Sequence, residues 1–342
     1  MVENKNAISP APPAYGMPVG VRFSDMIGLI PRWAWLGGKW PYFMQMALAV
    51  FVGSIWTLKA LANTSKVSST LSAISHVLSV SYLRSWHIYW HTQINHARNT
   101  LIFSTLCRLP GERLLRWGRR HTQVDIRPPK EVAPEKPVIY LVVSFALHYF
   151  GMLQPVRQQY ANVRKIAVVQ PRCALEPLQK IGFYQSLSRM TGQRIEGIAA
   201  DQPLVARQIA RAVRQGFSVA MRVDSMPTET VRMVGSRLCG KAAMFPLSIL
   251  EIAKRLEVDL VVLSVVREED VFRTASHLRL AVPAQASGEA LTEMACRIDG
   301  VIGALIARYP EQYTAWHAVA ERWRLAREIE QALADGGEYG AA

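Results

Sequence analysis

The chain has 342 residues, of which half are hydrophobic and nine are Trp, and it carries 40 Lys and Arg against 26 Asp and Glu. This composition excludes an intrinsically disordered protein, and the length allows about two domains. The four cysteines lie more than fifty residues apart. Because no CxxC pair exists, the sequence argues against a zinc ribbon or a thioredoxin-type site and predicts buried thiols in a reducing compartment.

The positive charge is concentrated toward the N-terminus. Residues 1–137 contain 16 Lys and Arg against 6 Asp and Glu, whereas the remaining 205 residues contain 24 against 20. Seven of the nine Trp also precede residue 120. Indole rings favour the membrane interface and basic side chains favour acidic headgroups, so this region fits an anionic membrane surface. No nucleic-acid-binding motif accompanies the charge, and we expect no nucleic-acid partner.

The N-terminal part is predicted to consist of a loose tail over residues 1–30 and a helical, membrane-facing region over residues 31–125. Within that region, residues 42–58 (YFMQMALAVFVGSIWTL) contain no charge. Their length is the lower limit for a helix that spans a bilayer. A helix lying in the membrane interface and a helix buried against the next domain are the alternatives.

An arginine cluster follows inside a stretch, residues 66–121, that is predicted to be helical throughout. Arg116, Arg119 and Arg120 are interleaved with Leu115 and Trp117. Such a pattern is typical of a solvated helix face, or of a face that binds lipid headgroups or an acidic carrier protein. The positive surplus of this part of the chain favours the second interpretation.

Four prolines within residues 126–137 predict a linker, because proline at this density breaks helices and stiffens the chain. Residues 138–330 then alternate apolar, β-rich runs with helical patterns. Near-continuous hydrophobic strands are buried on both faces of a sheet, so we predict an α/β fold with a mixed, largely parallel sheet flanked by helices. The runs lie at 138–146, 165–170, 217–223 and 259–266, the helical patterns at 174–190, 202–215 and 247–257, a hairpin-like strand at 276–282 and a long helical stretch from about 288.

Two polar residues follow apolar runs, at the carboxyl ends of strands where open α/β sheets bind ligands. His148 comes two residues after the run VIYLVVSFA, and Asp224 comes directly after FSVAMRV. His148 is either a structural or a catalytic histidine, and Asp224 is either a turn residue or a site residue. Asp201 is expected to be the N-cap of the helix at 202–215.

The sequence lacks GxGxxG, GxxxxGK[ST], HExxH and GxSxG motifs, which argues against nucleotide binding, zinc hydrolysis and nucleophile-elbow chemistry. His87 and His91 share a helix face at i, i+4 spacing, with His96 nearby. No acid or cysteine stands close to them in the sequence, and the flanking Trp86 and Trp90 are typical of an interfacial belt. We therefore predict no metal ion and no cofactor.

Four stretches over roughly residues 138–323 share the features of one known family. They are SFALHYFGML around His148, AVRQGFSVAMRVD ending at Asp224, LCGKAAMFPLSILEIAKRLEVDLVVLSVV with Gly240, Phe245 and Pro246, and YPEQYTAWHAVAERW. In that order they resemble the HX4(D/E) segment, the strand-and-aspartate segment, the FP-x-G segment and the closing YPEQ signature of the lipid A biosynthesis lauroyl/myristoyl acyltransferase family. This family lies within the lysophospholipid acyltransferase superfamily, and the resemblance implies that superfamily's fold.

The resemblance implies an acyltransferase that moves an acyl group from an acyl-carrier-protein or acyl-CoA thioester to an amine or hydroxyl of a small molecule or lipid, in a specialised lipid or natural-product pathway. It further implies a location at the cytoplasmic face of a bacterial inner membrane, peripheral or singly anchored, with a soluble cytoplasmic protein as the alternative. In this interpretation His148 is the general base and Asp224 orients it or binds the acceptor. Substrate binding is assigned to Gly240, Lys241, Phe245 and Glu176, and carrier or headgroup contact to Arg116, Arg119 and Arg120.

One residue departs from the family pattern at its most important position. Leu153 stands five residues after His148, where the family has a carboxylate, and Ser248 replaces a glycine of FP-x-G. In serine proteases, disabling the acid that orients the histidine costs about 10⁴ in rate. Three explanations are open. Asp224 or Glu176 replaces the acid in space, the acceptor is an amine that needs a weaker base, or the chain has lost activity and serves as a membrane-associated binding or scaffold protein.

Overall fold

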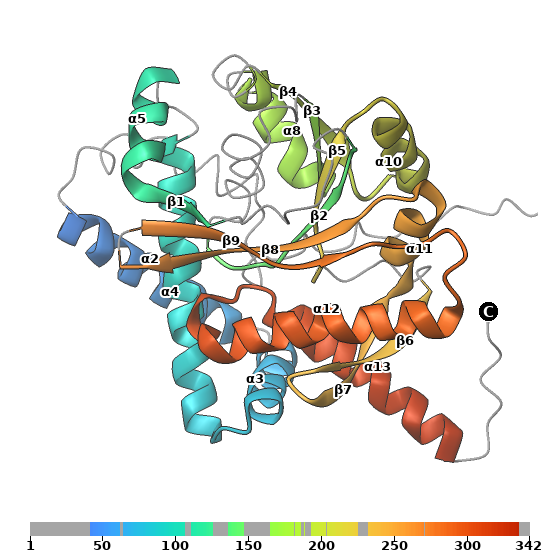
Figure 1. Cartoon of the computed structure of the whole chain (residues 1–342). Helices are drawn as coiled ribbons and strands as arrows, with labels where there is room; N and C mark the ends of the chain where they lie inside the picture. Colours follow the sequence, from blue (N-terminus) through green and yellow to red (C-terminus); the bar gives the residue numbers. More distant parts are fainter. Residues whose placement is uncertain are drawn as a thin grey trace, which may run out of the picture.

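The computed structural model of the chain describes residues 42–61, 64–106, 111–125, 136–146, 165–180, 182–185, 188, 193–202, 204–224, 232–269 and 271–334. Its strands are β1 (Thr122–Asp125), β2 (Ile139–Val142), β3 (Lys165–Gln170), β4 (Arg194–Ala199), β5 (Ser218–Arg222), β6 (Met233–Leu238), β7 (Lys241–Pro246), β8 (Leu260–Glu268) and β9 (Val271–Leu280). Seven of them form one sheet in the order β1-β9-β8-β2-β5-β3-β4 (Figure 1). Neighbouring strands run parallel except β8 and β9, which are antiparallel.

Helices flank both faces of this sheet. The N-terminal helices are α2 (Tyr42–Leu61), α3 (Thr64–Leu78), α4 (Tyr82–Leu106) and α5 (Gly111–His121). The later ones are α8 (Arg172–Lys180), α10 (Val205–Arg214), α11 (Leu247–Leu256), α12 (Gly288–Arg308), the short 3-10 helix η1 (Pro310–Gln312) and α13 (Trp316–Ala334). The predicted α/β class, with a mixed, largely parallel sheet and a helical N-terminal region, is therefore confirmed. The predicted tail over residues 1–30 and most of the predicted linker lie outside the described residues.

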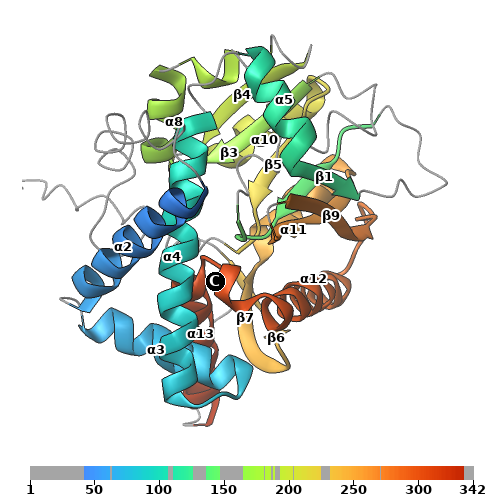
Figure 2. The ribbon, with the colours of Figure 1, turned by 90° about the vertical axis from the view of Figure 1, so that its left-hand side faces the viewer.

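The central strands are buried on both faces, as their apolar composition predicts. Ile139 and Leu141 of β2 lie in one hydrophobic cluster with residues of α10, α11, α12 and α13. Tyr140 and Val142, which alternate with them, lie in a second cluster with residues of α4 and α8. Figure 2 shows α4 running the length of the molecule beside α2. At the carboxyl ends of the strands, the face under α4 carries buried polar residues.

Several strands were not predicted or differ in extent. The run 165–170 is strand β3 as predicted, but the run 138–146 forms a strand only to Val142, because Phe145 N–H turns back to donate to the Val143 carbonyl at 2.8 Å. The predicted strand at 276–282 begins earlier, at Val271. β1 follows directly after the stretch 66–121 that is predicted to be helical, at the end of the predicted N-terminal helical region, and pairs with β9. The short strands β1, β4, β6 and β7 contain polar residues or Gly that interrupt an apolar pattern.

The prediction for Asp201 is wrong. α10 begins after Leu204 with no side-chain cap, and the Asp201 carboxylate instead accepts the N–H of Arg172 at 2.9 Å. Arg172 is the first residue of α8, so Asp201 satisfies a free amide of that helix from the adjacent loop. A capping residue distant in sequence cannot be found from local spacing.

Strands β6 and β7 form a hairpin that is anchored by a buried ion pair. Cys239 and Gly240 form its turn with φ of 51° and 77°. Both values are positive, as in the tight turns that favour glycine. Next to the hairpin, the Asp299 carboxylate of α12 accepts hydrogen bonds from Ser236 Oγ at 2.5 Å and from Arg322 Nη2 of α13. Burial raises the pKa of Asp299, although Arg322 and Ser236 oppose the shift.

The N-terminal helices pack closely on one another and leave one face of α2 apolar and exposed. A Cβ on Gly53 would lie 2.6 Å from Ile94 Cα, so glycine is required where α2 crosses α4. Met44, Phe51 and Leu58, spaced seven residues apart, are exposed on α2. No single helix among the described residues has the length and hydropathy of a membrane span, whereas Met46–Leu61 and Thr64–Leu78 meet the criterion together and are bent by 111°.

Candidate active site

The carboxyl ends of β2, β5 and β3 carry a row of buried polar residues. Val142 of β2 is aligned with Arg222 of β5, and Val168 of β3 is aligned with Ala220, two residues before Arg222. Because side chains alternate along a strand, Gln170 at the end of β3 and Arg222 lie on the same face of the sheet. That face is covered by α4 and α8. The edge at which open α/β sheets bind ligands is therefore polar in this protein.

Ser144 holds Asp224 and Arg222 together at this edge. Its N–H and Oγ–H donate to the two carboxylate oxygens of Asp224 at 2.8 and 2.5 Å. The Arg222 Nε–H donates to Ser144 Oγ at 2.6 Å and lies 3.8 Å from Asp224 Oδ1. All three residues are buried, and Asp224 is 1% exposed. Hydrogen bonds compensate this buried charge pair. They also fix the ends of β2 and β5 to each other, four residues before His148 in the sequence.

The YPEQ signature packs against the same edge. The Ser144 carbonyl accepts hydrogen bonds from the Thr314 N–H at 2.8 Å and from Thr314 Oγ1 at 2.9 Å. Gln312 accepts from the Arg267 N–H and donates to the Arg267 carbonyl, both at 2.8 Å. The signature therefore joins the ends of β2 and β8, and its role in this structure is to hold the sheet edge in place.

Two partly buried histidines lie near Arg222, one from α4 and one from α13. Burial, reinforced by the positive charge of Arg222, lowers the pKa of His96 to about 4 and that of His317 to about 4. The His96 ring also lies against Trp56, with ring centroids 5.6 Å apart. Protonation of either imidazole would place a second cation beside the buried guanidinium. Both histidines are therefore neutral at neutral pH and unsuited to act as a general base.

Further polar groups border the row. Burial, followed by the nearby Asp224 carboxylate, raises the pKa of Tyr313 well above its ordinary value. Among the described residues, Gln170 Oε1 and His96 Nε2 are buried without a hydrogen-bond partner. Leaving such groups unpaired costs about 1–3 kcal/mol each, which natural proteins tolerate mainly where a ligand or water completes the site. We call Ser144, Gln170, Arg222 and Asp224, with His96, Tyr313 and His317 against them, the edge cluster.

The predicted site residues are distributed over several elements. His148 and Leu153 lie outside the described residues, and Asp224 is in the edge cluster. Glu176 is exposed on α8. Gly240, Lys241 and Phe245 belong to the hairpin, where Arg322 Cζ lies 5.6 Å from the buried Phe245 ring.

The predicted carrier-contact residues lie on α5. Arg116, Arg119 and Arg120 are exposed there. Trp117 faces inward, with its ring centroid 6.0 Å from that of Phe272 on β9. The arginines are therefore free to meet a partner, and the proposed contact remains a prediction.

Sequence reasoning missed most of the edge cluster, although one signal was present. Arg222 is a charge near the end of the apolar run FSVAMRV, and a charge in a buried strand is rare unless it is paired. Ser144 is the corresponding polar residue near the end of VIYLVVSFA. His96 and His317 lie 221 residues apart in sequence, and no local pattern relates them.

The exposed His87 of α4 contacts an acid that is distant in sequence. His87 Nε2 lies 3.5 Å from Glu311 Oε1, and the rings of His87 and His91 have centroids 4.3 Å apart. Arg84 also pairs with this carboxylate, at 3.3 Å. Within the described ranges, no three His, Cys, Asp or Glu side chains are arranged to hold a metal ion.

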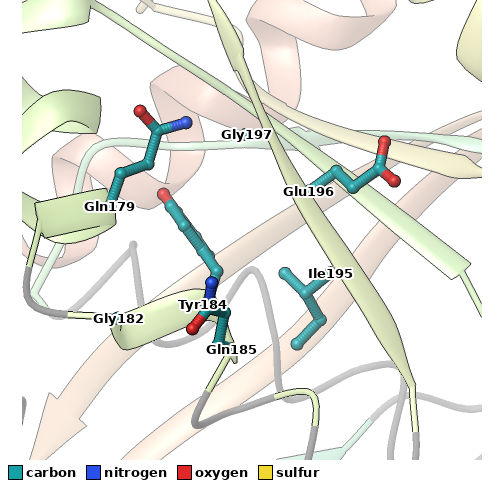
Figure 3. A pocket seen from close by; sticks show the side chains of 7 residues that line it. All are labelled: Gln179, Gly182, Tyr184, Gln185, Ile195, Glu196 and Gly197. Atoms are coloured by element: carbon teal, nitrogen blue, oxygen red, sulfur yellow. The ribbon is translucent and has the colours of Figure 1, made fainter.

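A separate cavity of about 320 Å³ lies between α8 and β4, at the edge of the sheet (Figure 3). Gln179 and Tyr184 line one side, and Ile195 and Glu196 of β4 line the other. The Glu196 carboxylate is already paired with Arg194, whose Nε donates to it at 2.7 Å. Of the residues that the structure describes, none of the predicted site residues and none of the edge cluster lines this cavity.

Comparisons with known proteins assign little. No protein-family model and no curated protein match this chain. One solved structure with some likeness is the 1-acyl-sn-glycerophosphate (LPA) acyltransferase PlsC from Thermotoga maritima, with a TM-score of 0.36 and 12% sequence identity, over 72% of this chain and 97% of that chain. A likeness at this level assigns neither a fold family nor an activity to this chain.

Proposed function

We propose that the chain is an acyltransferase that moves an acyl group from a carrier-protein or coenzyme A thioester to an amine or hydroxyl acceptor. The four stretches that resemble lipid A acyltransferases support this proposal. The observation that carries it is the clamp formed by Ser144 and Asp224, since it fixes a buried carboxylate at the strand end from which the chain leads to His148. Ligand and catalytic groups of open α/β sheets gather at such ends.

In the proposed reaction, His148 takes the proton from the acceptor N–H or O–H as that atom attacks the thioester carbonyl. A C–N or C–O bond forms, the C–S bond breaks, and the proton passes from His148 to the departing thiolate. Asp224 takes over the electrostatic role of the absent motif carboxylate, because its negative charge favours the imidazolium of His148. Two residues, Asp224 and Glu176, are candidates to replace the motif acid in space. Asp224 is buried and held in a fixed orientation, whereas Glu176 is exposed, so we favour Asp224.

The test is acyl transfer by the purified chain. It is incubated with acyl-carrier-protein and acyl-CoA thioesters of several chain lengths and with a panel of amines and alcohols, and products are followed by mass spectrometry. We expect product with at least one donor. Asp224→Asn should form product more slowly, whereas His91→Ala, a half-exposed histidine on α4, should not change the rate. Equal rates for Asp224→Asn and the unaltered chain would contradict the role of this carboxylate.

A second candidate function is a catalytically inactive, membrane-associated binding or scaffold protein. Two observations favour it: Leu153 replaces the motif acid, and the apolar face of α2 carries Met44, Phe51 and Leu58. Exposed apolar side chains in such a row are typical of helices that lie in a membrane interface. We propose the cytoplasmic face of a bacterial inner membrane as the location under either function. Absence of product with every donor and acceptor would favour this second function.

A further inference from the structure

α10 carries a row of arginines on its exposed face. Arg207, Arg211 and Arg214 are all exposed. Their spacing of four and three residues places them on one face of the helix, over about 10 Å. The opposite face, with Ile209, is buried in the hydrophobic core. The orientation of the helix is therefore fixed, and the three guanidinium groups point outward.

Within the part of the chain that the structure describes, these arginines have no counter-charge. The sequence of α10, VARQIARAVR, contains no acidic residue. Among the described residues, none of the three arginines forms an ion pair, whereas Arg194, Arg232, Arg279 and Arg324 each pair with a carboxylate. Like charges at i, i+4 and i, i+3 destabilise a helix. An uncompensated row of this kind is therefore a cost in the isolated protein, and an acidic partner would relieve it.

An exposed apolar residue continues the same row. Leu204, three residues before Arg207, is 58% exposed. Its backbone has φ 71° and ψ 20°, the left-handed region that a branched side chain rarely adopts. Strained residues of this kind are typical of positions that contact a ligand. The row therefore consists of one apolar residue, Leu204, followed by three arginines. Successive members are three, four and three residues apart, at Arg207, Arg211 and Arg214.

From this arrangement we propose that the α10 row (Leu204, Arg207, Arg211 and Arg214) is the docking surface for an acidic helix of a partner protein. Resting on the proposed function, that partner is the acyl-carrier protein that delivers the thioester. An acidic helix presents carboxylates at i, i+4 and i+7, which match the three arginines, while Leu204 contacts an apolar residue of the partner.

α10 packs on the sheet face opposite to α4 and α8, but its first turn reaches the edge of the sheet that carries the edge cluster. α10 follows β4, so Leu204 and Arg207 lie at the carboxyl edge of the sheet, the edge at which Gln170 and Asp224 end their strands. A membrane is a poorer occupant, because α10 and α2, the helix with the exposed apolar row, lie at opposite sides of the molecule in Figure 1. A membrane in contact with α2 therefore leaves the α10 row accessible to a protein.

Direct binding tests this proposal independently of catalysis. Binding of fluorescently labelled acyl-carrier protein to the full chain is measured by anisotropy at low and high salt. The double reversal Arg211→Glu with Arg214→Glu should weaken binding about tenfold or more at low salt, because it opposes two carboxylates to an acidic surface. The matched control is Arg237→Glu with Arg297→Glu, which changes the net charge equally at two exposed, unpaired arginines on β6 and α12. The control should bind as the unaltered chain does.

Leu204→Gly separates binding from stability. Glycine favours a positive φ, so this variant should be at least as stable as the unaltered chain while it binds carrier more weakly. Unchanged carrier binding by the double reversal overturns the proposal. The proposal is also overturned if carrier binding is lost only when Arg116, Arg119 and Arg120 of α5 are changed to Glu. It is overturned as well if the double reversal abolishes binding to anionic vesicles or RNA but leaves carrier binding intact.

The docking proposal and the proposed function fail separately. If carrier binds through α10 but no donor yields product, docking stands and acyl transfer is refuted. If transfer proceeds from acyl-CoA and from carrier at rates that the double reversal does not change, the function stands and docking at α10 is refuted.

Discussion

Removing the Asp224 carboxylate should destabilise the protein more than removing an exposed acid. Asp224→Ala deletes the acceptor of both Ser144 hydrogen bonds and removes the carboxylate that pairs with the Arg222 guanidinium, whose side chain is 5% exposed. Breaking a buried ion pair in this way costs about 3–5 kcal/mol. Since domains are stable by about 5–15 kcal/mol, this is a large part of the total.

Urea denaturation at neutral pH measures this loss, with Glu176→Ala, an exposed acid of α8, as the matched control. The control should change the free energy of unfolding by no more than about 0.5 kcal/mol. A double-mutant cycle with Arg222→Met should then show coupling, because the two changes remove the two partners of one buried ion pair. If Asp224→Ala lowers the free energy of unfolding by less than about 1 kcal/mol, or if the effects of the two changes are additive, the clamp does not stabilise the sheet edge.

Three further predictions concern pH, packing and the exposed face of α2. Because the pKa of His96 and of His317 falls from 6.5 to about 4 on folding, the unfolded chain binds more protons between these values. The contribution of these histidines to the free energy of unfolding should be fully present above pH 6.5 and decrease as the pH is lowered toward 4. Urea titrations at several pH values measure it. A free energy of unfolding that does not change over this range, or that changes equally in His317→Gln, would refute the burial of neutral histidines. Gly53→Ala should lower the free energy of unfolding by about 1–3 kcal/mol, since its Cβ meets the α4 backbone. The control Gly235→Ala adds a Cβ where there is open space and should leave the packing of α2 on α4 intact. Equal melting temperatures of the two variants would contradict this packing. Phe51→Ser with Leu58→Ser should reduce sedimentation with anionic vesicles without lowering the melting temperature, and unchanged sedimentation would exclude this face from membrane contact.

The architecture was largely predictable from the sequence, because buried parallel strands are continuous apolar runs. The runs that became β2, β3, β5 and β8 are of this kind, and they are the central strands of the sheet. β1 and β4 were missed because they are edge strands with polar residues, whose pairing depends on neighbours distant in sequence. Asp201 was assigned to the wrong helix for the same reason, since the amide that it accepts belongs to α8.

The candidate site was predictable only in part. The rule that groups at strand ends form sites pointed correctly to the edge at which Asp224 lies. It did not reveal that Ser144 binds both Asp224 and Arg222, because Ser144 lies 80 and 78 residues from them and meets them only through the parallel pairing of β2 with β5. Likewise, the YPEQ signature could be recognised, but its hydrogen bonds to β8 could not be derived from the motif.

The central claim is that the imidazole of His148 removes a proton while the thioester carbonyl is attacked. The most direct test is the single-turnover rate of product formation by His148→Ala, with circular dichroism to verify that the variant is folded. The account predicts that the rate falls by about 10²–10⁴ at neutral pH, the usual contribution of general base catalysis. A folded His148→Ala that forms product as fast as the unaltered chain would contradict it.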